Sequence, residues 1–227
     1  MKKLNVALVG LSFGLEFVAI YCKHPDIDKV YVVDKNEKLL NIAKERYSIP
    51  DERCFTDLQD VLDIPEIDAV HLVTPPATHA PFSVRVLNAG KHCGCTIPMG
   101  MSIQELNDII AARKASGKNY MFMETTIFQR EFLYIQELYK KGEFGRLQYM
   151  TCAHYQDMEG WPEYWEGFPP LMHPTHAVAP CLMLAGHLPD KVYARGSGKI
   201  RKESVKRLFE TGKHLCIYFS SGQRCDY

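Results

Sequence analysis

Short apolar runs alternate with amphipathic segments along the first half of the chain, which is the pattern of strands followed by helices. The runs that predict strands are almost entirely apolar, as expected for a parallel sheet that is covered on both faces. We expect strands over residues 4–9, 30–33, 69–73, around 93–95 and over 120–123. We expect helices over residues 14–22, 37–47, 57–62, 78–88 and 102–116.

Capping residues support several of these helices. Asn36 is placed to cap the second helix, and Ser102 followed by Glu105 forms a capping box for the fifth. Gly90 and Gly117 follow the fourth and fifth helices, where glycine readily adopts the left-handed conformation that ends a helix. The pattern therefore predicts a doubly wound parallel sheet of the Rossmann type.

The pattern changes after Met123. We expect one amphipathic helix over residues 132–139 and then a long strand over 147–155. A loop rich in tryptophan and proline follows over residues 156–174, before a second helix over 175–184 and another strand over 191–195. This is α+β character, so we place a domain boundary here and expect domains over residues 1–123 and 124–227.

A glycine-rich turn follows the first predicted strand. Gly10 suits a tight turn, Gly14 allows close contact with the next helix, and Ser12 stands where the dinucleotide-binding motif has its middle glycine. Asp34 ends the second strand 20 residues after Gly14, where an acidic residue binds the adenosine ribose. The turn predicts a nucleotide pyrophosphate at the helix N-terminus, although a glycine-rich turn also occurs in α/β proteins that bind no nucleotide.

The charge beside this turn bears on the cofactor. The carboxylate of Asp34 would repel a 2′-phosphate, so we expect NAD(H), and Lys35 next to it leaves NADP(H) open. Over the 227 residues the formal net charge is +0, which argues against nucleic acid or an anionic membrane as a partner.

Cysteine usage indicates a reducing compartment. Of the eight cysteines, Cys93 and Cys95 are too close together for a common zinc spacing and lie in an apolar run, so we expect buried thiols. Ser12 and Glu16 interrupt the apolar stretch at the N-terminus that would otherwise suggest a signal, and no stretch has the length of a membrane span. We therefore expect a cytoplasmic protein.

Several motifs, in the order in which they occur along the chain, resemble those of the glucose–fructose oxidoreductase, inositol dehydrogenase and MocA-like (Gfo/Idh/MocA) family. They are Val9-Gly10-Leu11-Ser12-Phe13-Gly14, Thr74-Pro75-Pro76 with His79, Ala89-Gly90-Lys91-His92, and Pro174-Thr175-His176-Ala177-Val178. The resemblance spans about residues 4–200. It implies a Rossmann domain followed by a second domain with an open, mostly antiparallel sheet that carries substrate contacts and oligomer interfaces. It also implies hydride transfer between a nicotinamide and a hydroxyl or keto group of a sugar, polyol or derivative.

The resemblance also assigns site residues. His176 is the expected catalytic acid–base. The residues expected to contact the cofactor are Gly10, Ser12, Phe13, Gly14, Asp34, Thr74, Pro75, His79, Thr96 and Pro98.

Two positions depart from the family pattern. The family usually carries Glu-Lys-Pro where this chain has Thr96-Ile97-Pro98, so its lysine is missing. It often has an aspartate four residues before the histidine, where this chain has Met172. The residues after about Gly212 do not resemble the family's continuation, so we expect the second domain to be incomplete here and the full-length protein to form a homo-oligomer.

Polar and aromatic residues near the second predicted domain suit sugar recognition. The expected substrate contacts are Glu124, His154, Tyr155, Asp157, Trp161 and His173. Glu124 follows a strand and is a candidate to replace the missing lysine. A zinc site formed by His154, His173 and His176 fits the residue types, but a hydride-transfer site explains the same residues without a metal, so we expect none.

Two functions remain open from the sequence. The first is an NAD(P)-dependent dehydrogenase or reductase that acts on CH–OH groups of a small-molecule substrate. The second is a nucleotide-binding sensor or regulator that has the same fold without the chemistry. The missing lysine and aspartate favour the second function, whereas His176 and the polar residues at 154–157 favour the first, and we expect the enzyme.

Overall fold

The structure is a computed structural model that describes residues 2–156, 160–165, 168, 170–194 and 217–220. The chain divides into two compact units, Met1–Met123 and Glu124–Tyr227. Asp157, an expected substrate contact, lies outside the described residues. Among the residues described, no helix is both long and apolar enough to cross a membrane.

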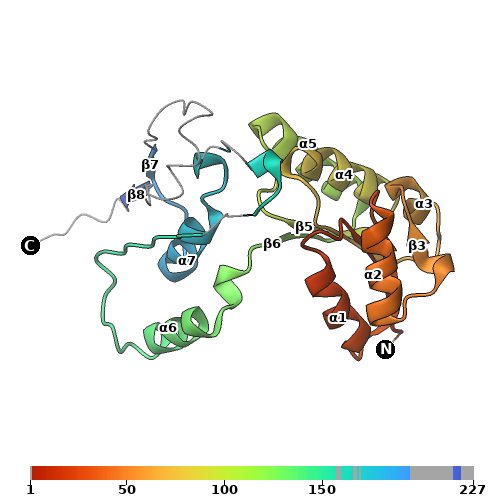
Figure 1. Cartoon of the computed structure of the whole chain (residues 1–227). Helices are drawn as coiled ribbons and strands as arrows, with labels where there is room; N and C mark the ends of the chain where they lie inside the picture. Colours follow the sequence, from red (N-terminus) through yellow and green to blue (C-terminus); the bar gives the residue numbers. More distant parts are fainter. Residues whose placement is uncertain (1, 157–159, 166–167, 169, 195–216, 221–227) are drawn as a thin grey trace, which may run out of the picture. The chain divides into compact units, whose positions relative to one another are not determined.

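The first unit contains a six-stranded parallel sheet (Figure 1). Its strands are β1 (Leu4–Val9), β2 (Ile27–Val33), β3 (Cys54–Phe55), β4 (Ala69–Leu72), β5 (His92–Thr96) and β6 (Tyr120–Met123). The spatial order is β3-β2-β1-β4-β5-β6, in which the direction of winding reverses between β1 and β4. This order is that of the Rossmann fold and confirms the predicted doubly wound sheet.

Helices cover both faces of this sheet (Figure 1). They are α1 (Leu15–Lys23), α2 (Glu37–Tyr47), α3 (Leu58–Leu62), α4 (Pro76–Asn88) and α5 (Ile103–Ser116). Alternate residues of one strand enter different cores: Ala7 and Val9 pack with residues of α3, α4 and α5, whereas Leu8 packs with residues of α1 and α2. Two buried faces explain why the strands are apolar at almost every position.

Local capping agrees with the sequence. The Asn36 side chain accepts a hydrogen bond from the N–H of Lys38, and the Ser102 hydroxyl accepts one from the N–H of Glu105. Gly117 follows α5 with φ +66°, which suits glycine. Cys93 and Cys95 are free and buried on β5, as expected for thiols in an apolar strand.

The described part of the second unit contains α6 (Arg130–Lys140), α7 (Thr175–Ala185) and an antiparallel pair, β7 (Lys191–Ala194) with β8 (Ile217–Ser220). Short 3₁₀ turns occupy Thr126–Phe128, Glu163–Trp165 and Pro170–Met172. The strand predicted over residues 147–155 is wrong, because the structure assigns no strand there. An apolar alternating run becomes a strand only when a neighbouring strand pairs with it, and none of the described strands does so.

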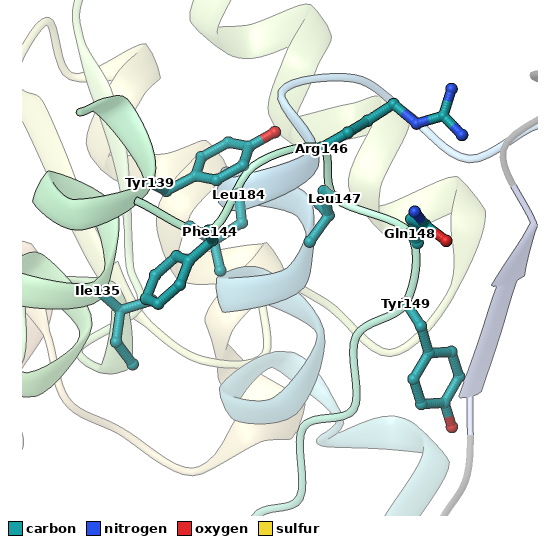
Figure 2. Close-up of a pocket in the computed structure, with 8 residues that line it drawn as sticks. All are labelled: Ile135, Tyr139, Phe144, Arg146, Leu147, Gln148, Tyr149 and Leu184. Carbon is teal, nitrogen blue, oxygen red and sulfur yellow. The ribbon is translucent and has the colours of Figure 1, made fainter. Parts of the chain in front are cut away.

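An open depression of about 440 Å³ lies in the second unit between α6, the segment after it and the end of α7 (Figure 2). Phe144 lies between Ile135 and Leu184, whereas Arg146 and Tyr149 extend away from them. The lining residues are Ile135, Tyr139, Phe144, Arg146, Leu147, Gln148, Tyr149 and Leu184. None of the site residues expected from the sequence is among them.

Candidate functional site

The glycine turn after β1 requires glycine at both ends. Gly10 has φ +92°, and a Cβ there would lie 2.3 Å from the carbonyl oxygen of Val73. A Cβ on Gly14 would lie 2.0 Å from the carbonyl oxygen of Gly10. The turn therefore passes against the end of β4 and then against itself, at the edge of the sheet where ligands of open α/β folds bind.

The N-terminus of α1 follows this turn. Ser12 and Phe13 are both exposed, and within the described residues their N–H groups have no backbone hydrogen-bond partner. Free N–H groups at a helix N-terminus attract anions. These features fit a dinucleotide whose pyrophosphate lies at Ser12 and Phe13.

Asp34, at the end of β2, links two turns. One of its carboxylate oxygens accepts a 2.6 Å hydrogen bond from the N–H of Leu11, and the other accepts a 2.8 Å bond from the N–H of Asn36. The side chain is only partly buried. The structure thus places the expected ribose-binding carboxylate directly against the glycine turn.

The turns after β4 and β5 hold the other expected cofactor residues. Pro75 is exposed, Thr74 is half-buried and accepts a 2.7 Å bond from the Thr78 hydroxyl, and the Thr96 hydroxyl donates to the carbonyl of Leu72. These side chains follow β4 and β5 at the carboxyl end of the parallel sheet, where the glycine turn follows β1, because β4 is the neighbour of β1 and β5 is the neighbour of β4.

His79 is buried beneath these turns, with 1% of its surface exposed. Its Nδ1 lies 2.6 Å from the carbonyl oxygen of Pro98, and its Nε2 lies 2.6 Å from that of Thr74. Burial lowers the pKa of His79, and the two carbonyl groups act in the opposite direction. A direct cofactor contact, expected from the sequence, would require one ring nitrogen to move away from its carbonyl group.

In the second unit, His176 is paired with Glu124. The Nδ1 atom of His176, in the first turn of α7, lies 2.6 Å from Oε1 of Glu124, the residue after β6. The Glu124 side chain is 2% exposed and that of His176 is 14% exposed. Glu124 also accepts hydrogen bonds from the N–H and the hydroxyl of Thr126, at 2.9 and 2.8 Å.

Two further imidazoles lie beside His176. The ring centroids of His154 and His173 are 4.5 and 5.4 Å from that of His176, and the rings of His173 and Trp165 pack in a T-shaped arrangement. Burial, together with the neighbouring His176 and His154, lowers the pKa of His173 to about 4, so this ring is neutral near pH 7. We call His154, His173, His176 and Glu124 the histidine cluster.

The remaining expected substrate contacts lie at more exposed positions. Tyr155 is 62% exposed, and Trp161 is 37% exposed and packs against Trp165. Met172, which stands where the family often has aspartate, is exposed and cannot ionise. Among the described residues, no group of histidine, cysteine or acidic side chains has the arrangement of a metal site.

Thr126 was not anticipated from the sequence. Its N–H and hydroxyl bind Glu124, and its hydroxyl also lies 3.3 Å from the carbonyl oxygen of His176. The only sequence signal was its place two residues after an acidic residue at a strand end, a common arrangement of local side-chain to backbone bonds. Residues from a strand end and from a helix start therefore form one connected group.

The family is shown by a comparison with family models. Residues 4–124 match the model described as an oxidoreductase family with an NAD-binding Rossmann fold, GFO_IDH_MocA. The chain belongs to this family, and the resemblance inferred from its motifs is confirmed.

Curated relatives match over a longer stretch. A protein of Shewanella sp. (strain W3-18-1), described as a glycosyl hydrolase family 109 protein, is 25% identical in an alignment 203 residues long that covers 79% of this chain and 44% of the relative. An alpha-N-acetylgalactosaminidase of Shewanella oneidensis is 24% identical over the same length. The chain thus spans less than half the length of these relatives.

Solved structures share the fold. The myo-inositol 2-dehydrogenase of Lactobacillus plantarum superposes with a TM-score of 0.76 and 18% identity, over 95% of this chain and 67% of that one. The WlbA dehydrogenase of Bordetella pertussis, solved with NADH and UDP-GlcNAcA, gives a TM-score of 0.73 and 22% identity, over 88% and 60% of the two chains.

Proposed function

We propose that this chain is part of an NAD(P)-dependent oxidoreductase that interconverts a hydroxyl and a keto group of a sugar, polyol or derivative. The observation that carries the proposal is the glycine turn of the first unit, which exposes Ser12 and Phe13 and is bonded to the carboxylate of Asp34. Membership of an NAD-binding oxidoreductase family supports it. The first unit would bind the cofactor, and the second would bind the substrate and mediate oligomer contacts.

The cofactor side rests on residues of the first unit. The N–H groups of Ser12 and Phe13 would bind the pyrophosphate, and Asp34 would accept hydrogen bonds from the ribose, which favours NAD(H) over NADP(H). The side chains of Thr74, Pro75 and Thr96 would line the nicotinamide end. When bound, the nicotinamide supplies the hydride acceptor or donor.

A residue of the second unit would accept and return the proton. Removing a hydride from an alcohol carbon requires the hydroxyl proton to leave, and a histidine is suited to accept it near neutral pH. His176 uses Nδ1 for Glu124, so Nε2 is the nitrogen that would receive the proton. In the reverse direction, the same nitrogen would return the proton to a ketone oxygen.

The substrate class is supported by side chains and by relatives. Tyr155 and Trp161 expose aromatic surface, which can cover the apolar face of a sugar ring, and His154 and His173 offer hydrogen-bonding atoms near His176. The similar structures include an inositol dehydrogenase and a dehydrogenase bound to a nucleotide sugar acid.

The decisive experiment has two stages. NADH fluorescence titration first establishes cofactor binding, and NAD⁺ reduction is then followed against a library of sugars and polyols. Binding followed by turnover of a library member supports the dehydrogenase. Binding without turnover of any sugar, with the full-length protein, would favour a sensor or regulator that kept only the nucleotide site. Absence of NADH and NADPH binding would refute the proposal.

Glycoside cleavage is a second candidate, because the curated relatives are described as glycosyl hydrolases. Some glycosidases depart from the scheme of two carboxylates and depend on NAD. The two candidates differ in their products. A dehydrogenase accumulates NADH from NAD⁺ in proportion to substrate, whereas a glycosidase releases nitrophenol from a nitrophenyl N-acetylgalactosaminide with no net change in NADH.

A further inference from the structure

We infer that Glu124 is a positioning residue for His176: it holds the imidazole as the Nδ1–H tautomer, so that Nε2 faces the substrate as a proton acceptor. The catalytic part of this inference rests on the proposed function, whereas the tautomer itself does not. The sequence predicts a substrate contact for Glu124, and the hydrogen bond to His176 supports a role exerted through the histidine.

The hydrogen bond is short and its acceptor is held in place. Nδ1 of His176 lies 2.6 Å from Oε1 of Glu124, and the same oxygen accepts from the N–H and the hydroxyl of Thr126. The carboxylate is 2% exposed, so water has little access to it. A carboxylate fixed by its own neighbours can orient a ring that is bonded to it.

The charge state of Glu124 determines which partner donates. Burial raises the pKa of Glu124, but the bonds from His176 and Thr126 and the nearby Thr175 hydroxyl lower it, and the pKa falls to about 2. The side chain is therefore a carboxylate at neutral pH and has no proton to donate. Consequently the shared hydrogen belongs to Nδ1, and a neutral His176 carries its lone pair on Nε2.

The other titratable groups around His176 do not compete for this role. His173 is neutral near pH 7, because burial and the two neighbouring imidazoles lower its pKa to about 4. His154 is exposed, and its Nε2 lies 3.2 Å from the Gln156 side chain. Within the described residues, Glu124 is the one carboxylate hydrogen-bonded to an imidazole of the histidine cluster.

In this arrangement the proton and the hydride that leave the substrate each have an acceptor. The substrate hydroxyl would lose its proton to Nε2 as the hydride leaves the same alcohol carbon for the cofactor. The resulting imidazolium keeps its Nδ1–H bond to Glu124, and the negative carboxylate stabilises the new positive charge. The carboxylate belongs to Glu124, which lies 52 positions before His176 in the chain. The position four residues before His176 is occupied by Met172, which has no ionisable group.

Nitrogen NMR of the ring tests the tautomer directly. In the full chain labelled with ¹⁵N-histidine, the His176 signals are assigned by their loss in His176→Gln. When the ring is neutral, we expect Nδ1 to show the chemical shift of a protonated nitrogen and Nε2 that of an unprotonated one. The opposite assignment in the unmodified protein would overturn the inference.

Variants of Glu124 extend this test. In Glu124→Gln, the amide can donate to Nδ1, so the ring is expected to change to the Nε2–H tautomer, and Glu124→Asp should restore the Nδ1–H form. Glu131→Gln, which removes an exposed carboxylate bonded to Arg130, is the matched control and should change nothing. Unchanged His176 shifts in a folded Glu124→Gln protein would contradict the inference. If that variant does not fold, the spectrum of the unmodified protein decides.

Kinetics separates this inference from the proposed function. If a substrate is found, Glu124→Gln should reduce kcat by roughly 10²–10⁴-fold, with NADH affinity retained, and should move the acidic limb of the pH–rate profile to lower pH. Glu124→Asp should recover part of the rate. An active Glu124→Gln enzyme with an unaltered pH profile would refute the positioning role. A protein with the Nδ1–H tautomer but no oxidoreductase activity would refute only the proposed function.

Discussion

The carboxylate of Asp34 accepts a 2.6 Å hydrogen bond from the backbone N–H of Leu11. Leu11 is the first residue after Gly10, so the residue expected to bind the ribose also stabilises the turn expected to bind the pyrophosphate. One side chain therefore supports two parts of the proposed dinucleotide site, which makes it the most informative position to change in the first unit.

Asp34→Ala should weaken NADH binding by roughly 1.5–3 kcal/mol, the range for a hydrogen bond to a charged group. Titration calorimetry measures the change. Asp57→Ala is the matched control, because Asp57 makes a similar bond to the N–H two residues on, at the start of α3, away from the glycine turn. Equal NADH affinity in the two variants would remove Asp34 from the cofactor site.

Gly10→Ala should destabilise the first unit more than Gly90→Ala. Both glycines have positive φ, +92° and +72°, so both substitutions carry backbone strain of about 1 kcal/mol or more. Only Gly10 adds a steric clash, since its Cβ would meet the Val73 carbonyl, whereas a Cβ on Gly90 meets nothing within 4 Å. Urea unfolding of the two variants checks the order, and an equal loss would mean that the turn relaxes freely.

His176→Ala should lower kcat by roughly 10²–10⁴-fold once a substrate is known, which is typical of the loss of a general acid–base. NADH affinity should stay close to that of the unmodified protein, because the expected cofactor contacts lie in the first unit. His187→Ala, at an exposed position after α7, is the control. Turnover at an undiminished rate would make His176 a structural residue.

Acid should destabilise the protein in two successive pH ranges. The folded-state pKa of His173 is lowered to about 4 from 6.5, so its contribution is complete above pH 6.5 and is lost as the pH falls towards 4. His71 in the first unit, whose pKa burial also lowers to about 4, acts in the same range. The pKa of Glu124 is lowered to about 2 from 4.5, so its contribution, about 3 kcal/mol, is lost between those values.

Urea unfolding at a series of pH values separates these contributions. In His173→Gln, the free energy of unfolding should fall less steeply between pH 6.5 and 4, and the fall that remains there is due to His71. In Glu124→Gln, it should fall less steeply between pH 4.5 and 2. A stability curve that has the same slope in His173→Gln as in the unmodified protein would show that this ring is not neutral in the folded state.

Cysteine reactivity should follow burial. Burial raises the pKa of Cys93 and of Cys95 to about 12, so neither forms the reactive thiolate near neutral pH. Cys22 and Cys152 are exposed and should be alkylated before Cys93 and Cys95. Mass spectrometry after brief iodoacetamide treatment measures the order, and early labelling of Cys93 would show that β5 opens easily.

Features that depend on neighbouring residues in the chain were predictable from the sequence. The strands of the first unit follow from apolar runs, and Asn36 and Ser102 cap their helices because a cap bonds only two or three residues ahead. The family motifs pointed to His176 for the same reason, since the motif is a continuous stretch.

Features that depend on distant partners were not predictable. The bond between Glu124 and His176 joins residues 52 positions apart, and no local pattern in either segment indicates the other. The strand expected over residues 147–155 had suitable residues, but strand formation also depends on a partner elsewhere in the chain. His79 was expected to contact the cofactor, and no local pattern indicated that its ring would lie 2.6 Å from the carbonyl oxygen of Pro98, 19 residues later.

The two carbonyl groups around His79 have one further consequence. A neutral imidazole has a single N–H, so it can donate either to Pro98, after β5, or to Thr74, after β4, but not to both. The two strand ends therefore compete for one hydrogen atom whenever this ring is uncharged. Which of the two turns carries the hydrogen bond therefore depends on the tautomer of one buried side chain.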